Sequence, residues 1–125
     1  MSKKASVKLL VLLVFLFVSS SANAWSKKDT YWELAYLTTH VTDWGQTLDI
    51  SSQCRSGNYY ETNPVMGTCP SAQTVNAYFL GTALLHYGVA QMLPSKYRRM
   101  FQAGTMGMQL SYITNNASIG LNVKF

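Results

Sequence analysis

Long stretches without a charged residue limit how this chain can fold more than any other feature of its sequence. No Asp, Glu, Lys or Arg stands between Glu61 and Lys96, and none stands between Arg99 and Lys124. Soluble helices seldom run so far without a charged face. Only 12% of the 125 residues are charged, which is about half the usual fraction. Intrinsic disorder and a highly charged nucleic-acid binder are therefore both excluded.

The first 24 residues have the three-part layout of a secretory signal peptide. A basic start precedes an unbroken apolar run over residues 9–18, and the small-residue pattern Ala22-Asn23-Ala24 follows. Cleavage after Ala24 leaves residues 25–125 as a single weakly basic domain, so no nucleic-acid partner is expected. We expect an exported protein of the inner membrane or periplasm of a bacterium, encoded by the bacterium or its phage. An uncleaved membrane anchor is the alternative, although the run is short for a full span.

Three helices are predicted in the mature chain, over residues 30–50, 71–93 and 95–115. Thr30 and Glu33 fit a capping box at the start of the first helix. Pro94 is expected to stop the second helix, because proline cannot continue one. The tail that follows fits either a brief strand or a frayed end. The predicted fold class is therefore all-α, a small bundle of three helices.

The second and third predicted helices are candidates for membrane spans. Residues 76–93 and 100–121 carry no charge and are long enough to cross hydrocarbon. Polar residues dilute both stretches: Asn76, Thr82, His86, Gln91, Gln102, Gln109, Asn115 and Asn116. Small residues recur four apart, as in membrane helices that approach closely: Ala77 and Gly81, then Ala103, Gly107 and Ser111. A membrane-embedded or membrane-associated bundle is favoured, with a soluble periplasmic bundle as the alternative.

The first helix carries too many ionisable groups to be expected to span a membrane. Glu33, His40, Asp43 and Asp49 all fall within it. Glu33, His40 and Asp43, together with Thr47, recur at helical spacing and share one face. We expect this helix to lie at the membrane surface or to dip in and return.

Two short features surround the predicted turns. Cys54 and Cys69 are the only cysteines, and an exported chain can oxidise them to a disulfide that closes a turn-rich loop; two unpaired thiols are the alternative.

Lys96, Arg98 and Arg99 form a basic corner between the last two helices. We expect this corner to contact anionic lipid head groups, or to act as a charged turn that sets orientation.

The densest polar cluster joins the first helix to the loop after it. Asp43, Gln46 and Thr47 lie on the helix, and Glu61 and Asn63 lie in the loop. The structural interpretation is a polar clasp, in which the three helix residues hold the loop around Glu61 and Asn63. The functional interpretation is a polar site for a ligand, an ion or a proton.

This cluster also resembles a family signature. Asp43 followed by Thr47, and then the segment Glu61-Thr62-Asn63-Pro64, is similar to a signature of small multi-helix membrane proteins of unknown function. In that family the Asp-x-x-x-Thr element sits on one hydrophobic helix and the Glu-x-Asn-Pro element leads to the next. The resemblance covers residues 43–67 and implies a membrane-embedded multi-helix fold, but it supplies no reaction. This chain departs from the signature in its longer, cysteine-flanked loop.

The two histidines suggest one further hypothesis. His40 lies on one helical face with Asp43 and Glu33, and His86 lies in the middle of the next helix. A zinc site of His40 and His86 with Asp43, or with Glu33, is conceivable if those faces meet. Hydrogen-bonded histidines are the simpler interpretation. The sequence contains no HExxH, no paired-cysteine zinc motif, no Gly-x-Ser-x-Gly and no glycine-rich phosphate loop. No cofactor is predicted.

The sequence therefore predicts a small exported envelope or membrane protein with a non-enzymatic structural or interaction role. Its expected partners are membrane lipid, a membrane protein or a second copy of itself. One alternative is a membrane-embedded enzyme or ion- or proton-handling protein that uses Glu33, His40, Asp43, Glu61 and His86. Another alternative is a soluble periplasmic binding module.

Overall fold

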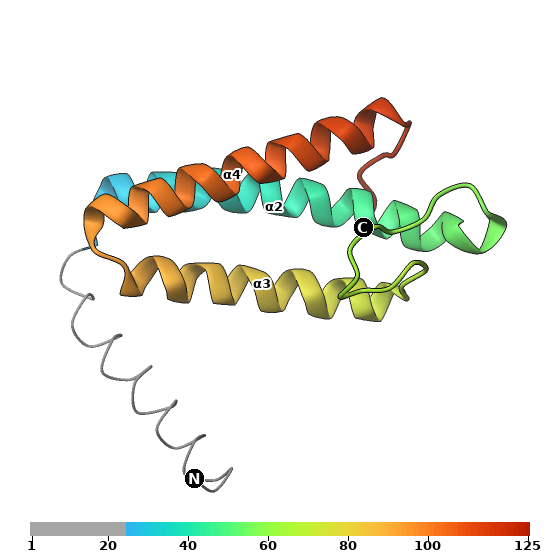
Figure 1. Ribbon diagram of the computed structural model, residues 1–125, viewed down its shortest axis with the longest axis horizontal. Coiled ribbons are helices and arrows are strands. Elements are labelled where there is room, and N and C mark those ends of the chain that lie inside the picture. The colour runs from blue at the N-terminus through green and yellow to red at the C-terminus, as the bar shows by residue number, and fades with distance from the viewer. Residues whose placement is uncertain (1–24) are drawn as a thin grey trace, which may run out of the picture.

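The computed structural model describes residues 25–125, and the predicted signal peptide lies outside them. These residues form the helices α2 (Lys27–Gln53), α3 (Ala72–Met92) and α4 (Ser95–Ser118), and a short 3-10 turn, η2 (Cys54–Ser56). The described part contains no strand. Figure 1 shows α3 running opposite to α2, and α4 returning in the direction of α2. The predicted all-α bundle of three helices is confirmed.

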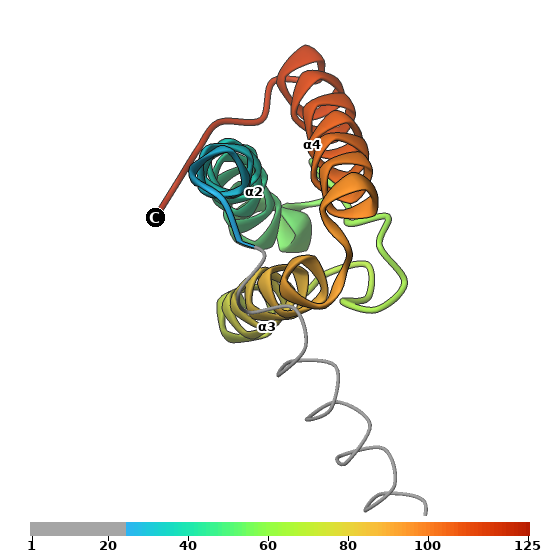
Figure 2. The ribbon, with the colours of Figure 1, turned by 90° about the vertical axis from the view of Figure 1, so that its left-hand side faces the viewer.

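Helix α2 is the central element of the bundle. Both α3 and α4 pack along it, while α3 and α4 contact each other little (Figure 2). The face of α2 that lies between its two neighbours is therefore the most enclosed surface in the molecule. It is on this face that the polar residues of the helix are found.

The helix ends show which residues set the boundaries. Ser26 caps α2: its side chain accepts from the Asp29 backbone N–H, and the Asp29 carboxylate accepts from the Ser26 N–H at 2.8 Å. The capping box predicted at Thr30 and Glu33 is therefore wrong, because Ser26 and Asp29 form it one turn earlier. The stop predicted at Pro94 is confirmed, since α3 ends at Met92 and Pro94 is the N-cap of α4.

A disulfide joins the end of α2 to the segment before α3. Cys54 and Cys69 are bonded, with their Cα atoms 5.5 Å apart, which confirms the predicted bridge. The Ser51 hydroxyl adds a hydrogen bond of 2.8 Å to the Pro70 carbonyl. These contacts close the loop between the two helices into a compact unit.

The C-terminal tail runs back along α2, where it is neither a strand nor frayed. The Lys124 backbone N–H donates to the Gly45 carbonyl at 3.0 Å. The Asn122 N–H donates to the Asp49 carboxylate at 2.8 Å. Leu121 is buried in a small apolar cluster with residues at the end of α2. The tail thus covers the side of α2 that α3 and α4 leave open (Figure 2).

None of the helices in residues 25–125 combines the length and apolar character needed to cross a lipid bilayer. The two stretches considered as spans fail because of the polar residues that dilute them. The two glycines of the small-residue pattern do not mark a close approach of helices. A Cβ atom added at Gly81 or Gly107 would meet nothing within 4 Å, because both glycines face away from the neighbouring helices.

Gly45 and Gly81 offer a matched test of how the tail docks. Gly81→Ala should raise the free energy of unfolding by about 0.5–1 kcal/mol, because alanine is the better helix former. Gly45→Ala should not show this gain, since its new Cβ would overlap the Val123 side chain and lie 3.3 Å from the Lys124 nitrogen. Urea denaturation measures the first quantity, and hydrogen exchange at the Lys124 amide reports release of the tail. An equal gain for both variants, with that amide still protected, would contradict the docking described here.

Candidate functional site

The enclosed face of α2 carries an almost continuous row of buried polar side chains. They are Asp29, Glu33, His40, Asp43, Gln46, Thr47 and Asp49. We call these residues, with the groups of α3, α4 and the tail that bond to them, the polar seam. The predicted shared face of Glu33, His40, Asp43 and Thr47 is confirmed, since all four lie in the seam.

At the start of the seam, Asp29 pairs with Arg98. The Arg98 Nη1 atom lies 3.0 Å from the carboxylate, and both side chains are almost fully buried. The Arg98 Nε atom also donates to the Ala90 carbonyl at 2.6 Å. Burial alone would raise the pKa of Asp29, but hydrogen bonds from Ser26 and from Arg99 and Arg98 hold the pKa of its carboxyl below the ordinary value.

The predicted lipid contact is wrong for Arg98, which has no exposed surface. A buried carboxylate requires a cation, and Arg98 supplies it from the first turn of α4. Arg99 is partly exposed and reaches Asp29 at 3.3 Å, while Lys96 is exposed. Only Lys96 and Arg99 remain accessible in the basic corner.

In the middle of the seam, Glu33 and His86 form a second buried pair. The His86 Nδ1 atom lies 2.8 Å from Glu33, and its Nε2 atom lies 2.7 Å from the Thr105 hydroxyl. Gln102 donates to the other Glu33 oxygen at 2.9 Å. The Tyr36 ring stacks on His86 with their centroids 3.4 Å apart. Three helices are joined through this one carboxylate.

His40 occupies the next position of the seam. Its Nε2 atom lies 2.9 Å from the Phe79 carbonyl, which can only accept, so Nε2 carries the proton. Its Nδ1 atom therefore accepts, and Gln109 Nε2 lies 3.0 Å away. Burial lowers the pKa of His40, and the neighbouring His86 lowers it further, so the ring is neutral near pH 7.

The zinc hypothesis for His40, Asp43 and His86 receives no support from this arrangement. Both ring nitrogens of each histidine already have protein partners. Within residues 25–125, no three His, Cys, Asp or Glu side chains gather in a way that would hold a metal ion.

At the far end of the seam, Asp49 is also neutralised. The Lys124 ammonium lies 2.6 Å from its carboxylate, and the side chain of Asp49 has no exposed surface. Burial would raise the pKa of Asp49, but hydrogen bonds from Lys124, Asn122 and Gln53 hold the pKa of its carboxyl below the ordinary value.

Asp43 is the exception in the seam. It is 8% exposed, and its Oδ1 atom accepts a single hydrogen bond of 3.2 Å from the neutral amide of Asn116. In the part of the chain that the structure describes, it has no ion-pair partner, and its Oδ2 atom has no hydrogen-bond donor. Burial, followed by the charge of Glu61, raises the pKa of Asp43 to about 7.

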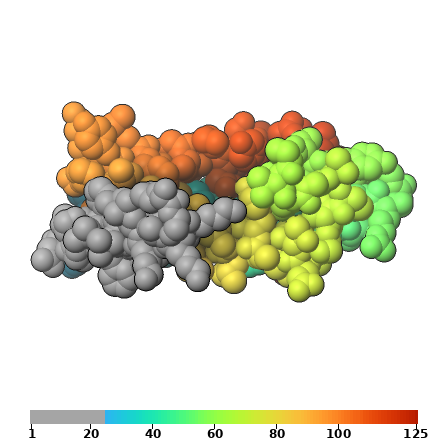
Figure 3. All heavy atoms as spheres, turned by 60° about the horizontal axis from the view of Figure 1, so that its bottom comes forward, coloured from blue at the N-terminus to red at the C-terminus, as the bar shows by residue number. Residues whose placement is uncertain are grey.

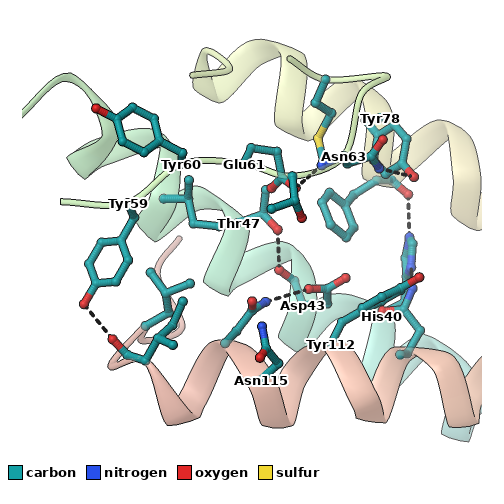
Figure 4. Close-up of a pocket in the computed structure, with 18 of the residues that line it drawn as sticks. His40, Asp43, Thr47, Tyr59, Tyr60, Glu61, Asn63, Tyr78, Tyr112 and Asn115 are labelled. Carbon is teal, nitrogen blue, oxygen red and sulfur yellow. Dashed lines mark hydrogen bonds between the residues drawn. The ribbon is translucent and has the colours of Figure 1, made fainter. Parts of the chain in front are cut away.

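Asp43 faces a cavity of about 850 Å³. The cavity lies between α2, α4, the start of α3 and the loop that follows η2 (Figure 4). Thr47, Glu61, Asn63 and Asn115 contribute polar groups to its wall, and Tyr59, Tyr60, Tyr78 and Tyr112 contribute aromatic rings. No Lys or Arg of the described chain lines it.

The loop side of the cavity is held by its own contacts. Glu61 Oε1 accepts from the Asn63 backbone N–H at 2.8 Å. Asn63 in turn donates to the Tyr78 hydroxyl of α3 at 2.8 Å. Figure 3 shows the loop covering the end of the bundle beside α3.

The structure brings all residues of the predicted clasp except Gln46 to one cavity, but the hydrogen bonds of these residues do not form the clasp. Asp43 and Gln46 both accept from Asn116, and Gln46 donates to the Ile113 carbonyl, so they clasp α4. Within residues 25–125, no hydrogen bond links Asp43, Gln46 or Thr47 to the loop residues Glu61 and Asn63. The cavity separates the two halves.

Several residues of the site escaped the sequence analysis. The sequence pattern does not single out Tyr36, and it marks Gln102, Gln109 and Asn116 only as polar residues that dilute a predicted span. One sequence signal could have identified these residues. In a chain with so few charges, polar residues recur at helical spacing within the uncharged stretches. In a packed bundle, such residues pair with buried acids.

Comparisons of this chain with protein-family models, with curated proteins and with solved structures find no match. The chemistry of the cavity is therefore argued from its own residues. Its distinguishing property is a buried carboxylate that, among residues 25–125, has no cation beside it.

Replacement of Asp43 by Asn tests this electrostatic description. Because its pKa is about 7 in the folded chain and about 3.8 when unfolded, the wild type should lose stability as the pH rises between those values. Asp43→Asn should therefore be more stable by a few kcal/mol at about pH 8, with the difference disappearing below about pH 4. Urea denaturation across this pH range measures the difference.

Asp49→Asn is the control with the opposite sign. The lowered pKa of Asp49 stabilises the folded state above the unfolded pKa, so this variant should be less stable than wild type at pH 8. A pH-independent difference for Asp43→Asn, or a loss of stability at pH 8, would contradict the description of Asp43.

Proposed function

We propose that this chain is a small, non-enzymatic binding protein of the bacterial envelope that holds a small polar molecule in the cavity beside Asp43. The observation that carries the proposal is a partly open cavity of about 850 Å³ whose wall holds a buried carboxylate with no cationic partner among the described residues. Small-molecule sites typically measure about 300–1,000 Å³ and combine apolar or aromatic walls with a few polar groups. The cavity meets both conditions.

The contacts of the polar residues favour binding over catalysis. Thr47 donates its hydroxyl proton to the Asp43 backbone carbonyl at 2.9 Å, so it is not poised against a base. His40 donates to a backbone carbonyl and accepts from Gln109. A nucleophile held by a general base is the usual requirement for covalent catalysis. Within the described residues, these groups are used to hold the bundle together.

An envelope location is supported by two properties of the molecule. The Cys54–Cys69 disulfide suggests an oxidising, exported compartment. Four of the five acids are buried, while the side chains of Lys27, Lys28, Arg55, Lys96 and Lys124 are exposed. The exposed charge is therefore mainly positive, which favours a position near anionic lipid head groups. We retain membrane lipid as the expected neighbour, and a membrane protein or a second copy as further partners.

One observation favours a second candidate function. A carboxyl with a pKa of about 7 changes charge near neutral pH, as a proton-handling group does. This alternative would rest on Asp43 and Glu61, because Glu33, His40 and His86 are fully engaged in the seam. The resemblance of residues 43–67 to small multi-helix membrane proteins stays a prediction and does not separate the two candidates.

A screen of polar fragments tests the binding function directly. Nuclear magnetic resonance of the purified chain should show fragments that shift signals of residues lining the cavity. Asn115→Trp places an indole at the cavity wall without removing a side-chain hydrogen bond, so it should weaken these fragments by about tenfold or more. Ser111→Trp is the matched control, because Ser111 is exposed on the same helix outside the cavity.

Fragments that bind wild type and Ser111→Trp alike but are lost from Asn115→Trp would support the proposal. If no fragment binds, or if Asn115→Trp binds the same fragments as well as wild type does, the cavity is not a binding site.

A further inference from the structure

We infer that the molecule held in this cavity is a small organic cation, of the amine or quaternary ammonium class. This inference rests on the binding function proposed above and specifies its ligand. Three properties of the cavity lead to it: the sign of its charges, carboxylate oxygens that lack donors among the described residues, and the aromatic rings in its wall.

The charges of the cavity wall are negative. Asp43 from α2 and Glu61 from the loop both line it, and the described chain places no Lys or Arg there. His40, the histidine in the wall, is neutral near pH 7 because burial lowers its pKa. Every other buried acid of α2 has a cationic or basic partner, namely Arg98, His86 or Lys124. A bound cation would supply the partner that Asp43 lacks.

The cavity also has spare acceptors. The Oδ2 atom of Asp43 has no donor among the described residues. The Glu61 carboxylate also lines the cavity, and among the described residues it accepts only from the Asn63 backbone N–H. A protonated amine brings N–H donors to such acceptors, and a quaternary ammonium brings a positive charge, whereas a carboxylate or phosphate brings neither.

The aromatic rings suit an organic cation better than a bare metal ion. Tyr59, Tyr60, Tyr78 and Tyr112 all line the cavity. Tyr60 and Tyr112 are exposed, and Figure 4 shows the Tyr60 ring pointing away from Asp43 and Glu61. The faces of tyrosine rings attract ammonium groups, most strongly where water is excluded. A single metal ion would fill little of a cavity of about 850 Å³. In residues 25–125 it would also find no set of three ligating side chains.

Choline and its neutral carbon isostere, in which a tert-butyl group replaces trimethylammonium, form a pair of probes with the same shape. Titration calorimetry on the full mature chain at about pH 8 should show choline binding at least about tenfold more tightly than the isostere. Asp43→Asn keeps the size of the side chain and removes its charge, so it should lower choline affinity by about tenfold and leave the isostere unchanged. Ser111→Trp should bind choline as wild type does.

The outcomes separate the two proposals. If polar fragments occupy the cavity but choline and the isostere bind equally, or if Asp43→Asn leaves choline affinity unchanged, the cation inference is overturned and the binding function stands. Preference for an anionic fragment, or displacement of choline by stoichiometric calcium chloride, would overturn the inference in the same way. If neither the fragments nor choline bind, the binding function itself fails.

Discussion

Burial of acidic groups on one face of α2 is the constraint on which the rest of the structure depends. An unpaired charge inside a protein costs several kcal/mol, so each buried carboxylate requires a partner from a neighbouring element. Asp29 obtains Arg98 from α4, Glu33 obtains His86 from α3, and Asp49 obtains Lys124 from the tail. These pairs set the register of the helices. Apolar residues such as Leu84 are consequently left on the outer surface.

The cavity follows from the same arrangement. Where α3 and α4 diverge from α2, the loop closes the space, and Asp43 faces that space instead of a basic side chain. Among residues 25–125, the amide of Asn116 is the only group that hydrogen-bonds its carboxylate. Its raised pKa is the electrostatic result of that poor solvation. The other buried acids along α2 each pair with a basic side chain of the protein. The proposed cation would pair with Asp43 in the same way.

The sequence predicts the local features of this fold and misses the long-range ones. The stop at Pro94 and the Cys54–Cys69 bridge depend on chemistry within a few residues or on compartment, so they can be predicted. Burial of Arg98 cannot, because its partner Asp29 lies 69 residues away and a basic residue beside a turn has the pattern of an exposed one. The cluster around Asp43 and Glu61 was predicted, but the cavity between them depends on the path of the loop, which no local pattern specifies.

The most direct test of the account is the titration of the Asp43 carboxyl carbon, followed by carbon-13 nuclear magnetic resonance with and without choline. The account predicts a midpoint of about 7 in the free protein. It also predicts a fall of about one pH unit or more when choline saturates the cavity, because a bound cation stabilises the ionised carboxylate. A midpoint of about 4 in the free protein, or one that choline leaves unmoved, would contradict it.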